Sequence, residues 1–173
     1  MLGLGSVETC YIKNGNYLIK GNGNKKEWIL YKSATNKIYE KYKNNDTIFV
    51  IDASVNNNTI KEKYRYKNTA KWTYKNSETG KAEVLKYNEY VFITDQGTEY
   101  FYYHKKYKID PTLFADHKYG HFSDFVLLSG CIPLDINKDL GPYNCSWSAE
   151  DFFFEKLEDT VFKIPYHLIL KNK

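Results

Sequence analysis

The sequence predicts a mostly β fold, an antiparallel β-sandwich or open barrel with one C-terminal α-helix. Three observations lead to this prediction. Aromatic residues make up 17% of the 173-residue chain and 17 residues are tyrosine, a residue type that favours strands. Short apolar runs alternate with turns rich in Asn and Gly, as in antiparallel sheets. Aromatic and basic residues alternate in residues 63–75, the period of a strand with two different faces.

The N-terminal half is interpreted as a series of strands. Residues 9–13 and 17–20 flank Asn14-Gly15-Asn16, which is a strong hairpin signal. Residues 35–43 fit a helix face and a strand equally well. Strands are expected at 27–32, 47–51, 63–67 and 70–75.

The meander is expected to continue to about residue 104. Its strands are predicted at 82–87, 90–94 and 98–104, with Gln96-Gly97 as the last tight turn. After Pro111 the pattern predicts a loop with a helical turn, a short buried strand at 125–128, and a polar loop at 134–145. Ser148 is expected to cap a helix, because acidic residues follow it and apolar residues recur at helical spacing. A last strand is expected after Pro165.

The sequence predicts a short arm followed by one domain, and its charge differs between the two ends of the chain. Residues 1–8 are expected to form an irregular arm, since Gly3 and Gly5 suit neither helix nor strand, and residues 9–173 a single β-rich domain. Residues 1–75 carry 14 basic and 6 acidic side chains, whereas residues 110–173 carry 6 and 10. This polarity fits a subunit whose basic surface meets an acidic surface of a neighbour, and it fits two solvated faces equally well.

Cysteine content and hydropathy bear on the cellular setting. Three cysteines favour free thiols, although a bridge between Cys131 and Cys145 is conceivable. No apolar run approaches the roughly 20 residues that span a bilayer. The first residues lack the basic and apolar regions of a secretion signal, so a cytoplasmic protein without membrane contact is expected unless the chain belongs to a virion.

His117 and His121 are the strongest candidates for chemistry. Two histidines beside Lys118 could serve a metal-independent ribonuclease, one as base and the other as acid, with the lysine offsetting phosphate charge. Two solvated loop histidines explain the same residues more simply. Gly120 argues against the regular helix that a metal-binding histidine pair would need, and no metal or cofactor is expected.

The stretch from Lys61 to Lys75 raises the question of nucleic-acid binding. Such proteins stack bases on exposed aromatic rings beside lysines. Here Tyr64 and Tyr66 face one way, whereas Lys63 and Arg65 face the other. An aromatic face turned to the core would leave no stacking surface, and a solvated lysine face or a lysine face on an acidic neighbour is favoured instead.

The opening residues, Met1-Leu2-Gly3-Leu4-Gly5-Ser6, resemble the start of many small structural proteins of tailed bacteriophages. This resemblance covers about six residues. It implies a virion subunit of the head-to-tail region or the tail, with the arm lying on a neighbour. It brings no catalytic residues with it.

Three functions are therefore considered. The first is a non-enzymatic structural or assembly protein of a bacteriophage virion that contacts other subunits as a homo-oligomer or ring. The alternatives are the small ribonuclease and a carbohydrate- or peptide-binding β module. The residues expected at the contact surface are Leu2, Leu4, Tyr64, Tyr66, Trp72, Tyr100, Tyr102 and Tyr103.

Overall fold

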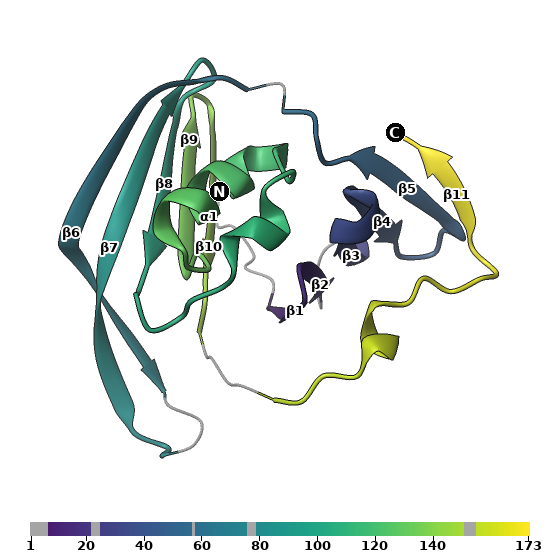
Figure 1. Ribbon diagram of the computed structural model, residues 1–173, viewed down its shortest axis with the longest axis horizontal. Helices are drawn as coiled ribbons and strands as arrows, with labels where there is room; N and C mark the ends of the chain where they lie inside the picture. Colours follow the sequence, from purple (N-terminus) through teal and green to yellow (C-terminus); the bar gives the residue numbers. More distant parts are fainter. Residues whose placement is uncertain (1–6, 22–24, 57, 76–78, 151–154) are drawn as a thin grey trace. The chain divides into compact units, whose positions relative to one another are not determined.

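The computed structural model describes residues 7–21, 25–56, 58–75, 79–150 and 155–173 (Figure 1). These residues form eleven strands in two sheets, one α-helix and four 3₁₀ helices. The predicted fold class, mostly β with largely antiparallel pairing and one helix, is confirmed. The 3₁₀ helices are η1 (Ser33–Thr35), η2 (Pro111–Phe114), η3 (Tyr119–His121) and η4 (Asp159–Phe162).

The first sheet has the strand order β1-β2-β3-β4-β5-β11. Neighbours along the chain pair antiparallel from β1 to β5, whereas β11 pairs parallel to β5. The β1–β2 turn contains Asn14 and Gly15, both with positive φ, as an Asn-Gly hairpin turn requires. The strands are β1 (Glu8–Lys13), β2 (Asn16–Gly21), β3 (Lys26–Lys32), β4 (Lys37–Tyr42), β5 (Thr47–Asp52) and β11 (Ile169–Asn172).

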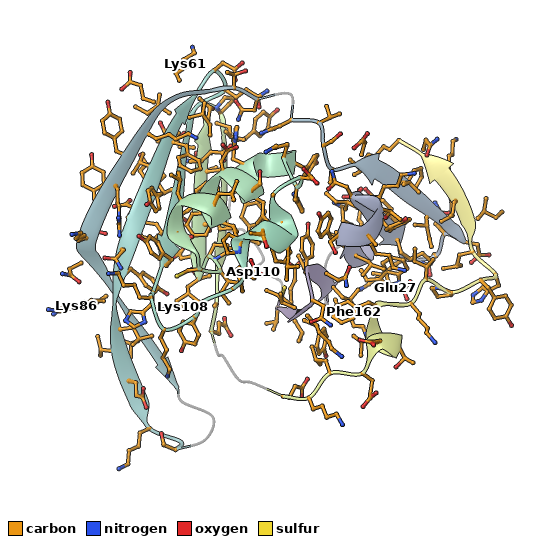
Figure 2. The ribbon with its side chains drawn as sticks, viewed as in Figure 1. Glu27, Lys61, Lys86, Lys108, Asp110 and Phe162 are labelled. Carbon is orange, nitrogen blue, oxygen red and sulfur yellow. The ribbon has the colours of Figure 1, made fainter. Side chains whose placement is uncertain are left out.

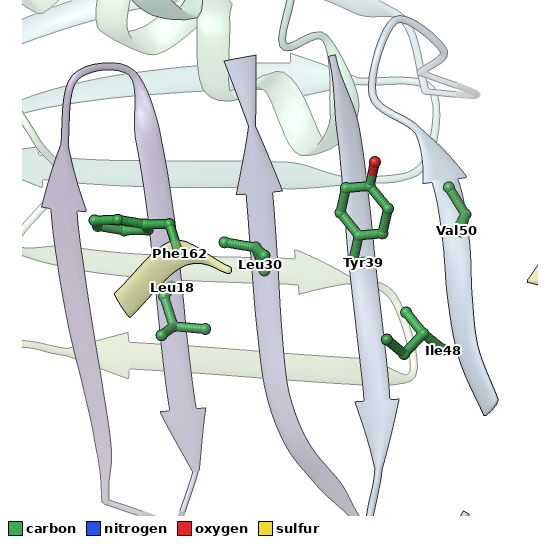
Figure 3. Packing of buried hydrophobic residues seen from close by; sticks show 6 residues of the cluster. All are labelled: Leu18, Leu30, Tyr39, Ile48, Val50 and Phe162. Carbon is green, nitrogen blue, oxygen red and sulfur yellow. The ribbon is translucent and has the colours of Figure 1, made fainter. Parts of the chain in front are cut away.

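The first sheet buries a cluster of apolar side chains beneath η4. Figure 3 shows Phe162 of η4 beside Leu18 and Leu30, with Tyr39, Ile48 and Val50 on the neighbouring strands. On the opposite face, the ring centroids of Tyr31 and Phe114 lie 6.1 Å apart. Both faces of this sheet therefore hold buried aromatic rings.

The second sheet has the order β10-β9-β8-β7-β6 and is antiparallel throughout. The helix α1 (Phe122–Ser129) lies on one face of it (Figure 1). Phe125 of α1 stacks on Phe101 at a centroid distance of 5.0 Å, and both rings are buried. The strands are β6 (Ile60–Lys75), β7 (Ala82–Thr94), β8 (Thr98–Tyr103), β9 (Asp135–Leu140) and β10 (Tyr143–Ser148).

Strands β6 and β7 extend beyond the rest of the second sheet. Of β7, residues 88–93 pair with β8. Residues 82–87 of β7 extend past the end of β8 and pair with residues 70–75 of β6. A register shift between Tyr66 and Ala70, with Asn68 at φ 54°, separates the two parts of β6. We call the paired residues 70–75 and 82–87 the ribbon.

Three predicted elements were wrong in type or place. Ser148 ends β10 instead of capping a helix, and residues 151–154 of the helix predicted after it lie outside the described residues. Among the described residues, the α-helix lies at Phe122–Ser129. Residues 125–128, predicted as a strand, belong to that helix. Residues 134–145, predicted as a loop, contain β9 and the start of β10, which pair across a turn at Gly141. The ambiguous segment 35–43 contains β4, and the predicted strands at 82–87 and 90–94 form one strand, β7.

Contacts divide the chain into two compact units. Unit 1 contains residues 1–55, 113–119 and 156–173, and unit 2 contains residues 56–112 and 120–155. Each unit holds one of the two sheets. The single domain predicted for residues 9–173 stays a prediction. Of the predicted arm, residues 1–6 lie outside the described residues, and Glu8 already begins β1.

Candidate functional site

The sheet of unit 2 carries tyrosines on the face away from α1. Tyr64 and Tyr66 come from β6, and Tyr100 and Tyr102 come from β8. The side chains of Phe101 and Tyr103, which alternate with these on β8, are buried against Phe125 of α1. Because successive side chains of a strand point to opposite faces, the four tyrosines share the other side, which we call the tyrosine face.

The register of β6, β7 and β8 arranges these tyrosines in two rows. Tyr64 lies opposite Val91, which lies opposite Tyr100. One step along, Tyr66 lies opposite Glu89, which lies opposite Tyr102. Directly opposed residues of antiparallel strands lie side by side on one face, so each row is continuous across the three strands.

The exposure of the tyrosine face differs between its strands. Tyr64 is 42% exposed and Tyr66 is 47% exposed, whereas Tyr100 and Tyr102 are half-buried. Burial and the neighbouring Glu89 carboxylate raise the pKa of Tyr102 to about 12, so its hydroxyl stays protonated at neutral pH. A hollow of about 260 Å³ beside Tyr100, lined among others by Asn137 and Ser146, continues this face onto β9 and β10.

The predicted separation of aromatic and basic residues on β6 is confirmed, and residues on both sides of this part of the strand are exposed. Lys63 lies over the buried ring of Phe92, with its Nζ 5.7 Å from the centroid, and Arg65 lies over Tyr90 at the same distance. The charged groups thus lie over core rings, and both side chains stay exposed to water at the same time. Both sides of this strand are therefore exposed, with the tyrosines on one side and the cations on the other.

The ribbon adds an exposed apolar side chain to unit 2. Val84 is 58% exposed. Lys86, labelled in Figure 2, lies two residues further along β7 and therefore on the same face, and it is exposed as well. An isolated two-stranded ribbon is only marginally stable in water, because it has no second layer to bury its apolar side chains. The backbone of Trp72 pairs with Leu85 in the ribbon, and its side chain lies outside the described part of the chain.

The remaining predicted contact residues divide into two groups. Tyr103 is only 1% exposed and stacks on Tyr90 with a centroid distance of 5.6 Å, so its prediction as a contact residue is corrected to a core role. The cause is alternation, which turns Tyr103 toward α1. Leu2 and Leu4 lie outside the described residues.

His117 is buried in unit 1 and is not the solvated residue that the sequence suggested. It is 1% exposed, and its Nε2 lies 2.9 Å from the Tyr17 hydroxyl. Burial lowers the pKa of His117 to about 4 and raises that of Tyr17. The ring is therefore neutral at pH 7, and its Nε2 shares a hydrogen bond with the Tyr17 hydroxyl. This bond fixes the segment after η2 to the sheet, which is a structural role.

His121 is buried in unit 2, at 2% exposure. The Asn56 Nδ2 atom lies 3.0 Å from its Nδ1 and 3.2 Å from its Nε2, and Asp124 Oδ2 lies 3.4 Å from Nδ1. These neighbours occupy the ring nitrogens that a substrate would need. Lys118 is exposed and its Nζ donates to the Ala115 carbonyl at 2.9 Å. The environment of both histidines thus favours anchoring over acid–base catalysis.

Other chemistry finds little support in the described part of the chain. Cys10, Cys131 and Cys145 are all free, as the preference for free thiols predicted. Among the residues that the structure describes, no group of three or more His, Cys, Asp or Glu side chains is arranged to hold a metal ion. No helix of the described ranges is long and apolar enough to cross a membrane.

Comparisons with protein-family models, with curated proteins and with solved structures found no match to this chain.

Proposed function

We propose that this chain is a non-enzymatic structural or assembly protein, and that the tyrosine face binds a second copy of the chain. The observation that carries this proposal is the pair of exposed rings, Tyr64 and Tyr66, on a sheet whose other face already packs on α1. Tyrosine is enriched at protein interfaces because it buries a large ring and keeps a hydroxyl for hydrogen bonding.

The ribbon supports the same function. The ribbon consists of two paired strands and exposes Val84. Such a segment gains a second layer when it contacts a neighbour. Val84 is an even number of residues from Tyr90 and Phe92 on β7, so it lies on the side of the sheet opposite the tyrosine face. The ribbon therefore offers a second contact, separate from the tyrosine face.

A bacteriophage virion is the setting that we propose for this assembly, in the head-to-tail region or the tail. The resemblance of residues 1–6 to virion proteins supports this setting, and so does a β-rich body that offers tyrosines for contact. Ring-shaped assemblies use one patch many times, so a modest contact is sufficient. Capsid and tail genes on both sides of the coding gene would be the expected neighbourhood, and a neighbourhood of unrelated metabolic genes would contradict this setting.

The solution mass of the full chain tests the contact. We expect native mass spectrometry to show an oligomer that the double substitution Tyr64→Ser and Tyr66→Ser converts to monomer. Tyr166→Ser is the matched control, because Tyr166 is fully exposed and lies in unit 1, and it should keep the oligomer. A wild-type chain that stays monomeric up to roughly 1 mM would overturn the proposal, since the contact would then be weaker than about −4 kcal/mol.

A further inference from the structure

An open depression of about 790 Å³ lies in unit 1 where β4 turns into β5. Its lining includes three lysines, Lys25, Lys43 and Lys173, and two aromatic rings, Tyr42 and Phe49. The backbone N–H of Lys43 donates to the Lys25 carbonyl at 2.9 Å, which holds these two lysine positions side by side. The tyrosine face lies on the other sheet, so this depression is a separate feature.

The charge around the depression is unbalanced. The buried Glu40 carboxylate, 4% exposed, pairs with Lys26 and with Lys173, whose Nζ lies 2.9 Å from Oε2. Two cations thus share one anion. Lys25 and Lys43 have no ion pair with an acidic side chain among the residues that the structure describes. The depression therefore presents an excess of positive charge to a ligand.

The two aromatic rings of the depression hold each other in fixed orientations. The centroids of Tyr42 and Phe49 lie 5.6 Å apart with the ring planes at 89°, so each ring fixes the other edge to face. The Tyr42 hydroxyl donates to Glu40 Oε2 at 3.2 Å, which holds its orientation from the other end. Both rings are half-buried and keep part of their surface accessible.

We propose that this depression binds a phosphorylated small molecule with a flat ring, of the nucleotide class. Lysine ammonium groups are compact cations that suit phosphate oxygens. A base or similar ring would pack on Tyr42 or Phe49, in the manner in which single-stranded nucleic acids stack on aromatic side chains. The volume falls in the range of small-molecule sites, and the lining combines two aromatic rings with three lysines and two asparagines, which suits a ligand that is itself highly polar.

Calorimetric titration of the full chain with adenosine 5′-diphosphate, pyrophosphate and adenosine tests both parts of the proposal. We expect the diphosphate nucleotide to bind more tightly than pyrophosphate, because only the nucleotide uses the rings. Adenosine alone should bind at least tenfold more weakly than the nucleotide, because it leaves the lysines unused. Raising the salt concentration should weaken the binding of the nucleotide and leave the binding of adenosine unchanged.

Lys25→Gln and Lys43→Gln should each weaken nucleotide binding about tenfold, the loss expected for one charge-assisted hydrogen bond. Lys37→Gln is the matched control, since Lys37 is an exposed lysine at the opposite end of β4, and it should bind as the wild type does. Absence of nucleotide binding at a concentration of about 10 mM would overturn the proposal. Equal binding of nucleotide and pyrophosphate, or tight binding of hexaglutamate instead, would overturn it too.

Discussion

Individual buried polar residues show how the cores tolerate charge and hydrogen-bonding groups. Glu99 in unit 2 is 2% exposed and accepts from Lys138 Nζ at 3.0 Å and from Asn58 Nδ2 at 3.2 Å. Glu40 in unit 1 is held in the same way by two lysines. A buried carboxylate is costly unless it is paired, so these lysines keep the two carboxylates charged, although Lys26 and Lys173 are themselves 37% and 51% exposed.

His117 provides a pH-dependent contribution to stability. Its pKa is about 4 in the folded chain and about 6.5 when unfolded, so the unfolded state binds more protons between these values. Stability should therefore fall as the pH drops from 6.5 toward 4, by about 2 kcal/mol between pH 7 and pH 5. Urea unfolding at both pH values measures this loss.

The variant His117→Gln isolates this contribution from the carboxylates that also titrate in acid. Its amide oxygen can accept the Tyr17 hydroxyl, and it carries no proton in this range. The difference in unfolding free energy between wild type and variant should shrink by the same amount at pH 5. A difference that stays constant with pH would show that His117 does not carry the effect.

At the scale of elements, alternation and turn residues predicted most strands. The Asn14-Gly15 turn and the Gln96-Gly97 turn formed as expected, because each places a glycine at positive φ. The helix was misplaced because Phe122–Ser129 is a short apolar run, in which periodicity cannot separate strand from helix. Packing of Phe125 on Phe101 and the left-handed Gly130, whose N–H donates to the Val126 carbonyl at 2.8 Å, favour the helix.

The candidate contact surface could be predicted only in part, because the pattern of one strand does not show which element packs on it. Alternation on β6 predicts that tyrosines and cations lie on opposite faces of the strand, but it does not determine which of the two faces packs against the core. That choice depends on α1, which packs on the side of Lys63 and is absent from the local pattern. Strands β9 and β10 were missed because both are largely polar, and β10 is an exposed edge strand, so neither carries much of the apolar signal that identifies a strand.

The short helix η4 should stabilise unit 1 through one side chain. Phe162 is 5% exposed and packs into the apolar cluster of the first sheet. Phe162→Ala should lower the free energy of unfolding by about 3–5 kcal/mol, through lost burial and the cavity that remains. Tyr166→Ala, four residues away and fully exposed, should change it by less than about 0.5 kcal/mol. Urea denaturation of both variants measures the contrast, and equal effects would contradict the assigned packing.

At the scale of the whole molecule, the two units are built from interleaved segments. Both ends of residues 56–112 continue directly into unit 1, at Val55 and Leu113. Residues 120–155 are likewise bounded on both sides by segments of unit 1. Neither unit is one continuous stretch, so removing a terminal segment by truncation would take part of unit 1 and leave its remaining segments incomplete.

This interleaving predicts a single unfolding transition. Folding of unit 1 fixes the ends of both segments of unit 2, which lowers the entropy cost of closing them, so loss of either unit should destabilise the other. Hydrogen exchange in increasing urea should therefore give the same midpoint for core amides of Leu30 in unit 1 and Phe101 in unit 2. Phe162→Ala, a change confined to unit 1, should lower both midpoints together. Two separate midpoints, with only that of unit 1 responding to the substitution, would show that the units fold independently.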